Sequence, residues 1–68
     1  MTETLGEALP KEMARGRDQL LPLYDAIPAG IVAATMMRAD LDRAAKAMAA
    51  GDLPEMIRAY AALQEYKL

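Results

Sequence analysis

Two short breaks divide this sequence into three segments, and each segment repeats its apolar residues at the spacing of a helix. At the first break, Pro28 suits the first turn of a new helix and Gly30 permits the chain to reverse. At the second, Gly51 can adopt the left-handed conformation that closes a helix, and Asp52 can cap the next one. The sequence therefore predicts an all-α fold, a small three-helix domain over residues 1–68, with helices at about 9–26, 29–50 and 53–66.

The first predicted helix carries one inward stripe that a proline interrupts. Pro10 suits the first turn of this helix, so residues 1–8 are expected to form a loose N-terminal segment. Pro22 lies within the helix, where its missing N–H and its ring should kink the helix or end it early. Gly16 costs about 1 kcal/mol relative to alanine, and a tolerated glycine is favoured here over a close helix contact. The residues expected to face inward are Leu9, Met13, Gly16, Leu20, Leu23 and Ile27.

The second and third predicted helices form a tight hairpin at Gly51 and Asp52. Glu55 follows Asp52 by three residues, which completes the pattern of a capping box at the start of the third helix. On the outer face of the second helix, Asp42 and Lys46 are four residues apart and should form an ion pair. The expected inward residues are Ala34, Met37, Leu41, Ala44 and Met48 on the second helix, and Leu53, Met56, Ile57, Tyr60 and Leu63 on the third.

Six residue types are absent from the chain, and three of them carry most enzyme chemistry. There is no histidine, cysteine or serine, and Trp, Phe and Asn are missing as well. Acid–base catalysis near neutral pH usually relies on histidine, and covalent catalysis usually relies on serine or cysteine. Zinc, iron and copper sites require thiolate or imidazole ligands, and the acidic residues form no calcium-binding loop. The sequence therefore predicts a non-enzymatic protein without a catalytic site, a metal or a cofactor.

Length and charge narrow the possible partners. A 68-residue chain without a disulfide or a metal buries only roughly 60% of its unfolded surface, yet 54% of its residues are apolar. This surplus favours self-association, and a homodimer is expected. The formal net charge is −2 and the basic residues are scattered, so no nucleic acid partner is expected. No apolar run reaches the ~20 residues of a membrane span and no signal-peptide layout is present, so a cytoplasmic protein without membrane contact is expected.

The longest uncharged stretch, residues 26–37, is the candidate contact surface. The second helix would be about 33 Å long and the third would reach about 21 Å back along it, so the first two turns lie beyond that reach. Coverage by the first helix, a homodimer contact and a site for a different partner all remain open. Met36 is the best single candidate, because it points about 100° away from Met37. The predicted contact comprises Ile31, Val32, Met36 and Met37, with a rim of Arg38 and Arg43.

The predicted hairpin resembles part of a known helical repeat. The turn and second helix of a tetratricopeptide repeat resemble Gly51-Asp52, Glu55, Ile57, Tyr60 and Leu63. Where that repeat has a large aromatic residue and a Leu-Gly pair, this chain has Asp40 and Arg43-Ala44, and no second copy follows at a period of 34 residues. A shared way of building a helical hairpin is therefore favoured over membership in that repeat family.

A second resemblance covers nearly the whole chain. Short hypothetical proteins encoded in bacterial prophages look similar in the runs Glu7-Ala8-Leu9-Pro10, Pro28-Ala29-Gly30, Gly51-Asp52, Met56-Ile57 and Tyr60. None of these runs is a catalytic signature, and the resemblance implies no activity for any particular residue. It implies a context, because small acidic phage proteins often bind and disable one host protein.

These observations predict a small protein–protein interaction module, dimeric and acting by occlusion of a host protein. Tyr24 and Tyr66, near predicted helix ends, are expected to be half-buried caps on the core rather than interface residues. Two other functional classes stay open. A structural or assembly subunit would act only through self-association. A small helical DNA-binding regulator would need a basic surface, whereas the second helix balances Arg38 and Arg43 against Asp40 and Asp42.

Overall fold

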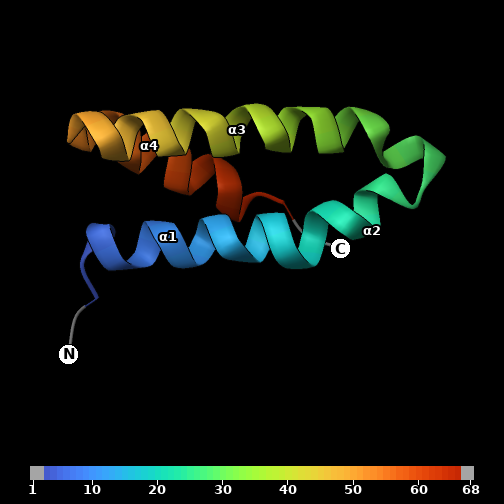
Figure 1. Cartoon of the computed structure of the whole chain (residues 1–68), viewed down its shortest axis with the longest axis horizontal. Helices are drawn as coiled ribbons and strands as arrows, with labels where there is room; N and C mark the ends of the chain where they lie inside the picture. Colours follow the sequence, from blue (N-terminus) through green and yellow to red (C-terminus); the bar gives the residue numbers. More distant parts are fainter. Residues whose placement is uncertain (1–2, 67–68) are drawn as a thin grey trace.

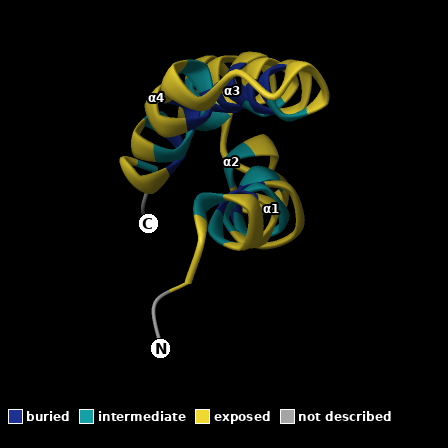
Figure 2. Ribbon diagram, turned by 90° about the vertical axis from the view of Figure 1, so that its left-hand side faces the viewer, coloured by how far each residue is buried: buried dark blue, intermediate teal, exposed yellow. Residues whose placement is uncertain are grey.

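The computed structural model describes residues 3–66 and shows three helical rods (Figure 1). In the first rod, α1 (Leu5–Arg15) continues through the π-helical turn η1 (Gly16–Leu20) into α2 (Leu21–Asp25). The 3-10 turn η2 (Pro28–Gly30) leads into α3 (Ile31–Ala50), and α4 (Leu53–Gln64) folds back along α3. Contacts join all three rods, since α1 packs on α4 as well as on α3 (Figure 2). The predicted all-α, three-helix fold is confirmed.

The first rod begins earlier than predicted, at Leu5, because Thr4 caps it. The Thr4 hydroxyl accepts a hydrogen bond from the Glu7 backbone N–H at 3.3 Å and donates to the Glu7 carboxylate at 3.0 Å. The pattern of a threonine followed three residues later by a glutamate is a capping box. Residues 5–8 are therefore helical and not a loose segment, and Pro10 lies inside the helix. The first two residues of the predicted loose segment lie outside the described residues.

The irregularity predicted at Pro22 occurs one turn earlier, as the π-helical turn η1. The backbone N–H of Leu21 donates to the carbonyl of Gly16, five residues back. In a regular helix, a proline ring clashes with the carbonyl four residues before it and leaves that carbonyl without a donor. The wider turn gives the ring room, so the chain stays helical past Pro22 as far as Asp25. The predicted helix over 9–26 is corrected to a helical rod over 5–25.

The π-helical turn also shifts the positions that face the core by one residue. Leu9 and Leu20 are buried as predicted, but Leu23 and Ile27 are 45% and 49% exposed. After the wide turn, Tyr24 packs against the core in their place. The inward positions predicted for Leu23 and Ile27 were wrong because a constant helical period was assumed across η1.

Gly16 lies where the first rod packs on α3 and α4. It is buried, and a Cβ atom placed there would lie 3.4 Å from the sulfur of Met37. The same atom would lie 3.9 Å from a methyl carbon of Leu41 and from one of Leu63. These are ordinary van der Waals distances, so a small side chain would fit at this position, in agreement with the interpretation of Gly16 as a tolerated glycine.

The hairpin between α3 and α4 closes as predicted. Gly51 has φ of +66°, in the left-handed region, and its N–H donates to the carbonyl of Met48 at 3.2 Å. The Asp52 N–H donates to the carbonyl of Ala47 at 3.0 Å, which completes a Schellman turn. The Asp52 carboxylate accepts from the Glu55 N–H at 3.3 Å, whereas the Glu55 carboxylate pairs with Arg58. Of the two hydrogen bonds in the predicted capping box, the one that the Asp52 carboxylate accepts is therefore formed.

α4 presents a narrower inward face than predicted. Met56 and Leu63 are buried, but Leu53 and Ile57 are 60% and 59% exposed. At about 100° per residue, a stripe centred on Met56 and Leu63 leaves those two residues on its flank. Their predicted inward positions were wrong. The helix ends at Gln64, and Tyr66 follows it outside the helix.

Small side chains fill much of the core. The buried hydrophobic residues are Leu9, Leu20, Ala34, Met37, Ala44, Ala47, Met56, Ala59 and Leu63. Alanine permits close helix approach but adds little apolar area, and the free energy of burial scales with that area. Seven large apolar side chains are exposed in the described chain, against five large ones in this core. The single chain thus leaves more large apolar groups outside its core than inside.

The turn between α2 and α3 depends on Gly30. A Cβ atom at this position would overlap the carbonyl oxygen of Tyr24 and lie 3.0 Å from its carbonyl carbon. We expect Gly30→Ala to lower the free energy of unfolding by about 1–3 kcal/mol, because the backbone must shift to relieve the overlap. Urea denaturation followed by circular dichroism measures the change.

Gly6→Ala is the matched control, because a Cβ atom there meets only Thr4 Oγ1 at 3.9 Å. It should raise the free energy of unfolding by about 0.5–1 kcal/mol, the difference in helix propensity. Equal unfolding midpoints for the two variants would contradict the role assigned to Gly30.

Candidate functional site

The unequal lengths of α3 and α4 leave one end of the domain with only two rods. The 20 residues of α3 span about 30 Å and the 12 of α4 about 18 Å, so α4 stops well short of the start of α3. Near the end of the described chain, the Tyr66 hydroxyl reaches Asp40, which lies halfway along α3. The first turns of α3 therefore contact the first rod but have no neighbour on the α4 side (Figure 1). The predicted shortfall of the third helix is confirmed.

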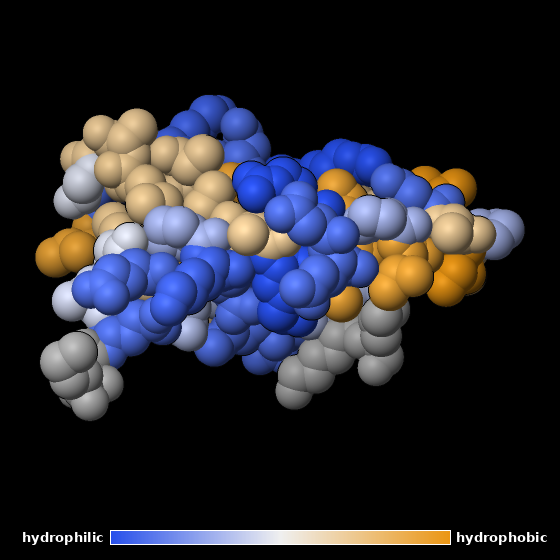
Figure 3. Space-filling model, turned by 60° about the horizontal axis from the view of Figure 1, so that its bottom comes forward, coloured by the Kyte–Doolittle hydropathy of each residue, from blue (hydrophilic) through white to orange (hydrophobic). Residues whose placement is uncertain are grey.

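Large apolar side chains gather at this two-rod end. Their exposed fractions range from 45% for Leu23 to 70% for Val32. Figure 3 shows the hydrophobic colours concentrated over the end that α2, η2 and the start of α3 form. We call this surface the apolar end, and it comprises Leu23, Ile27, Ile31, Val32 and Met36.

Three of the four predicted contact residues lie on the apolar end. Ile31, Val32 and Met36 are 60%, 70% and 57% exposed. Met37 is fully buried and packs against Gly16, so its assignment to the contact surface was wrong. The one-residue step from Met36 to Met37 turns the side chain by about 100°, from the surface into the core. Coverage of this stretch by the first rod is therefore partial.

The two predicted rim arginines lie in different surroundings. Arg38 donates to the Asp25 carboxylate at 2.6 Å, which joins α3 to the end of α2 beside the apolar end. Arg43 lies about 10 Å further along α3 than Met36, at 1.5 Å per residue, and donates to Asp40 at 2.8 Å. Arg38 is thus placed at the rim, whereas Arg43 belongs to a second cluster around Asp40.

The Asp40 cluster was not found by sequence reasoning. Asp40 is 8% exposed, and its two carboxylate oxygens accept hydrogen bonds from Arg43 at 2.8 Å and from the Tyr66 hydroxyl at 2.6 Å. Tyr66 packs on Tyr24 with the ring centroids 6.4 Å apart. Both tyrosines are half-buried, which agrees with their predicted role as caps on the core.

The Asp40 cluster is suited to holding the chain end in place and not to proton transfer. Burial, followed by the hydrogen bond to Asp40 and its charge, raises the pKa of Tyr66 to about 12. A phenol with so high a pKa is a poor acid near neutral pH. Both carboxylate oxygens of Asp40 are already engaged by donors. The cluster therefore joins α3 to the segment after α4.

Arg15 fixes the end of α4 from the other side. Its guanidinium donates to the carbonyls of Leu63 at 3.0 Å and Tyr66 at 3.3 Å, and it also pairs with Glu12. A cation at this position satisfies the unpaired carbonyls at a helix C-terminus. An open cleft of about 550 Å³ lies beside it, and its lining residues are Glu12, Arg15, Gln64 and Glu65.

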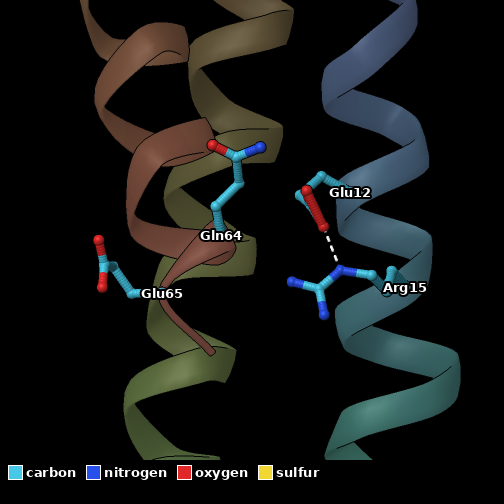
Figure 4. A pocket seen from close by; sticks show the side chains of 4 residues that line it. All are labelled: Glu12, Arg15, Gln64 and Glu65. Atoms are coloured by element: carbon cyan, nitrogen blue, oxygen red, sulfur yellow. Dashed lines mark hydrogen bonds and ion pairs between the residues drawn. The ribbon is translucent and has the colours of Figure 1, made fainter. Parts of the chain in front are cut away.

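Figure 4 shows the Arg15 guanidinium directed from α1 towards the end of α4. Arg15 is the only basic group among the described residues that line this cleft, and it is already occupied by carbonyls and by Glu12. In the described part of the chain, no buried side-chain polar atom lacks a hydrogen-bond partner. Among its described lining residues, the cleft thus offers a ligand no free basic group.

Positive charge is neutralised throughout the described chain. Of the eight lysines and arginines, Lys67 lies outside the described residues, and each of the other seven forms an ion pair with a carboxylate. The predicted pair of Asp42 and Lys46 is among them, at 3.0 Å. Within residues 3–66, no three acidic side chains lie close enough to hold a metal ion together. Over the same residues, no helix has both the length and the apolarity to cross a membrane.

Comparisons of the chain with protein-family models, curated proteins and solved structures found no match. The choice of a site therefore rests on the chain's own geometry, and the apolar end is the surface that its internal contacts leave unsatisfied.

Met36 and Met37 provide a direct test of which side of α3 is the surface. Met36→Glu should change the free energy of unfolding by no more than about 0.5 kcal/mol, because the new carboxylate points into water. Met37→Glu should leave the chain largely unfolded, because it buries a charge without a partner. Thermal unfolding followed by circular dichroism, at a low protein concentration, distinguishes the two. Unfolding of Met36→Glu would place that residue in the core.

Tyr66 should make stability depend on pH in the alkaline range. The pKa of Tyr66 is about 12 in the folded state and about 10 in an unfolded chain. The folded state thus favours the protonated phenol, so this contribution to stability is full below pH 10 and is lost as the pH rises towards 12.

Tyr66→Phe should abolish that part of the pH dependence and remove a phenol absorbance transition near pH 12. It should also lower the free energy of unfolding at pH 7 by about 1–2 kcal/mol, because Asp40 loses a donor. An absorbance titration and urea denaturation at pH 7, 10 and 11 measure both effects. Loss of a transition near pH 10 instead of near pH 12 would refute the Tyr66–Asp40 bond.

Proposed function

We propose that this chain is a small non-enzymatic protein–protein interaction module that binds through the apolar end. One observation carries the proposal. The three isoleucines and one valine of the chain, Ile27, Ile31, Val32 and Ile57, are all 49–70% exposed. β-branched residues are poor helix formers and are usually buried, so their exposure, on helices for Ile31, Val32 and Ile57 and in a turn for Ile27, has no benefit for the single chain.

The energy available at the apolar end suits reversible binding. Complete burial of an aliphatic side chain contributes about 1.5–3 kcal/mol. The five residues of the apolar end are on average about half exposed, so covering them would contribute roughly 4–8 kcal/mol before the entropic cost of association. Together with the surface that a partner would bury, this supports affinities in the micromolar range.

The electrostatics of the chain favour a protein partner over a nucleic acid. Phosphate binding requires lysine or arginine side chains that can release counterions. The described cations are paired with carboxylates, and the formal net charge is −2. The apolar end has one ion pair at its rim, between Arg38 and Asp25, and is otherwise uncharged. A DNA-binding regulator is therefore the weaker alternative.

The prophage resemblance extends the proposal to a biological role. A phage-encoded module of this kind would bind one host protein and block one of its surfaces, with no chemical step. A structural subunit that acts only through self-association is the main alternative. The same surface would serve both roles, because the apolar end is where large apolar groups gather on the described chain.

Site-specific photocrosslinking tests whether the apolar end is a contact surface in the cell. A photoreactive amino acid at Val32, which is 70% exposed, should form covalent adducts with a protein. The same probe at Lys46, whose side chain is 77% exposed on the charged part of α3, should form few or none.

Two substitutions, each combined with the Val32 probe, make the crosslinking experiment more specific. Met36→Glu should reduce the adducts from the Val32 probe at least about tenfold, because binding would bury the new charge. Ile57→Glu, at a residue of equal exposure on α4, should leave them unchanged. Equal adducts from both probes, or no effect of Met36→Glu, would refute the proposed contact surface.

A further inference from the structure

We infer that the apolar end is occupied by a second copy of this chain, in a twofold-symmetric dimer that joins the two-rod ends. This inference rests on the proposed function, because it identifies the partner of the same surface. Three features of the apolar end lead to it: the missing neighbour of α3, the self-complementary charge and the size of the surface.

The first feature is an unfilled place in the helix packing. From Asp40 to its end, α3 packs between the first rod and α4, but before Asp40 it has the first rod alone. Val32 and Met36 lie on the side of α3 that α4 would cover if α4 were longer, since Asp40 and Ala47 on that side are buried. A second two-rod end placed there would supply the missing helices and form a four-helix arrangement.

The second feature is charge. A twofold contact brings a surface against itself, so every charged group must be matched by an opposite charge on the same surface. The rim of the apolar end holds one cation and one anion, Arg38 and Asp25, which are paired at 2.6 Å. Under twofold symmetry, each pair can approach its counterpart without net repulsion. A strongly charged partner would gain nothing from this surface.

The third feature is size. The chain exposes 4511 Å², and a stable interface usually covers about 800 Å² on each partner. The apolar end spans α2, η2 and the first two turns of α3 and holds five of the seven large apolar side chains that are exposed on the described chain. The other exposed apolar pair, Leu53 and Ile57 on α4, is too small for this purpose and lies towards the opposite end of the molecule (Figure 1).

Light scattering of the full chain between about 1 and 100 μM tests the inference. We expect the mass to rise from one to two copies over this range and to stop there, because a twofold contact is closed. Met36→Glu should raise the dissociation constant of the dimer roughly 100-fold or more, since two like charges would be buried in one contact. Circular dichroism of each variant confirms that it is folded.

Ile57→Glu is the matched control, because Ile57 and Met36 are 59% and 57% exposed. In a twofold dimer of apolar ends, Ile57→Glu leaves the dissociation constant within about twofold of the original. If Ile57→Glu abolished association, or if the mass grew beyond two copies, the apolar end would be binding α4 of the next molecule head to tail, and the inference would be wrong.

A monomer at 100 μM also overturns the inference, and crosslinking then decides the proposed function separately. Adducts between the Val32 probe and a different protein would leave the proposed function standing with another partner. A monomer without adducts would overturn both.

Discussion

The hairpin at Gly51 and Asp52 determines how far α4 can reach along α3. The left-handed glycine and the Schellman bonds fix the point at which the chain reverses, so α4 runs back over the second half of α3 only. That register brings Leu63 over Gly16 and lets Tyr66 bond to Asp40. It also leaves the first turns of α3 without a second neighbour. The packed half of the domain and the apolar end thus follow from the same turn.

Local signals allowed most of the fold to be predicted, and the errors had both local and tertiary causes. Gly51 and Asp52 affect their immediate neighbours, and the sequence was sufficient to identify their effects. Pro22 indicated an irregularity in the first rod, but this irregularity occurs one turn earlier than predicted. The start of the first rod was missed although its signal was also local, because the pattern of Thr4 and Glu7 was overlooked in favour of Pro10. The contacts around Gly16 involve residues of two other helices, and no local pattern indicates them.

The candidate site could also be predicted only in part. Ile31, Val32 and Met36 could be assigned from an uncharged stretch and from helix lengths, which are both properties of the sequence. Met37 was assigned wrongly because membership in that stretch was given more weight than its place on the inward stripe. The bonds of Asp40 and Arg15 to the chain end span 26 and up to 51 residues of sequence, so only the folded arrangement reveals them.

Alanines form part of the core whereas the β-branched residues lie outside it, and this difference links the stability of the chain to its proposed function. Four alanines are buried where helices of one chain meet, which brings the backbones close but contributes little free energy of burial. Ile27, Ile31 and Val32 are exposed on the single chain. With a second copy on the apolar end, those residues would enter a shared core, and folding and association would become parts of one equilibrium. A chain of 68 residues without disulfides has few other ways to gain that stability.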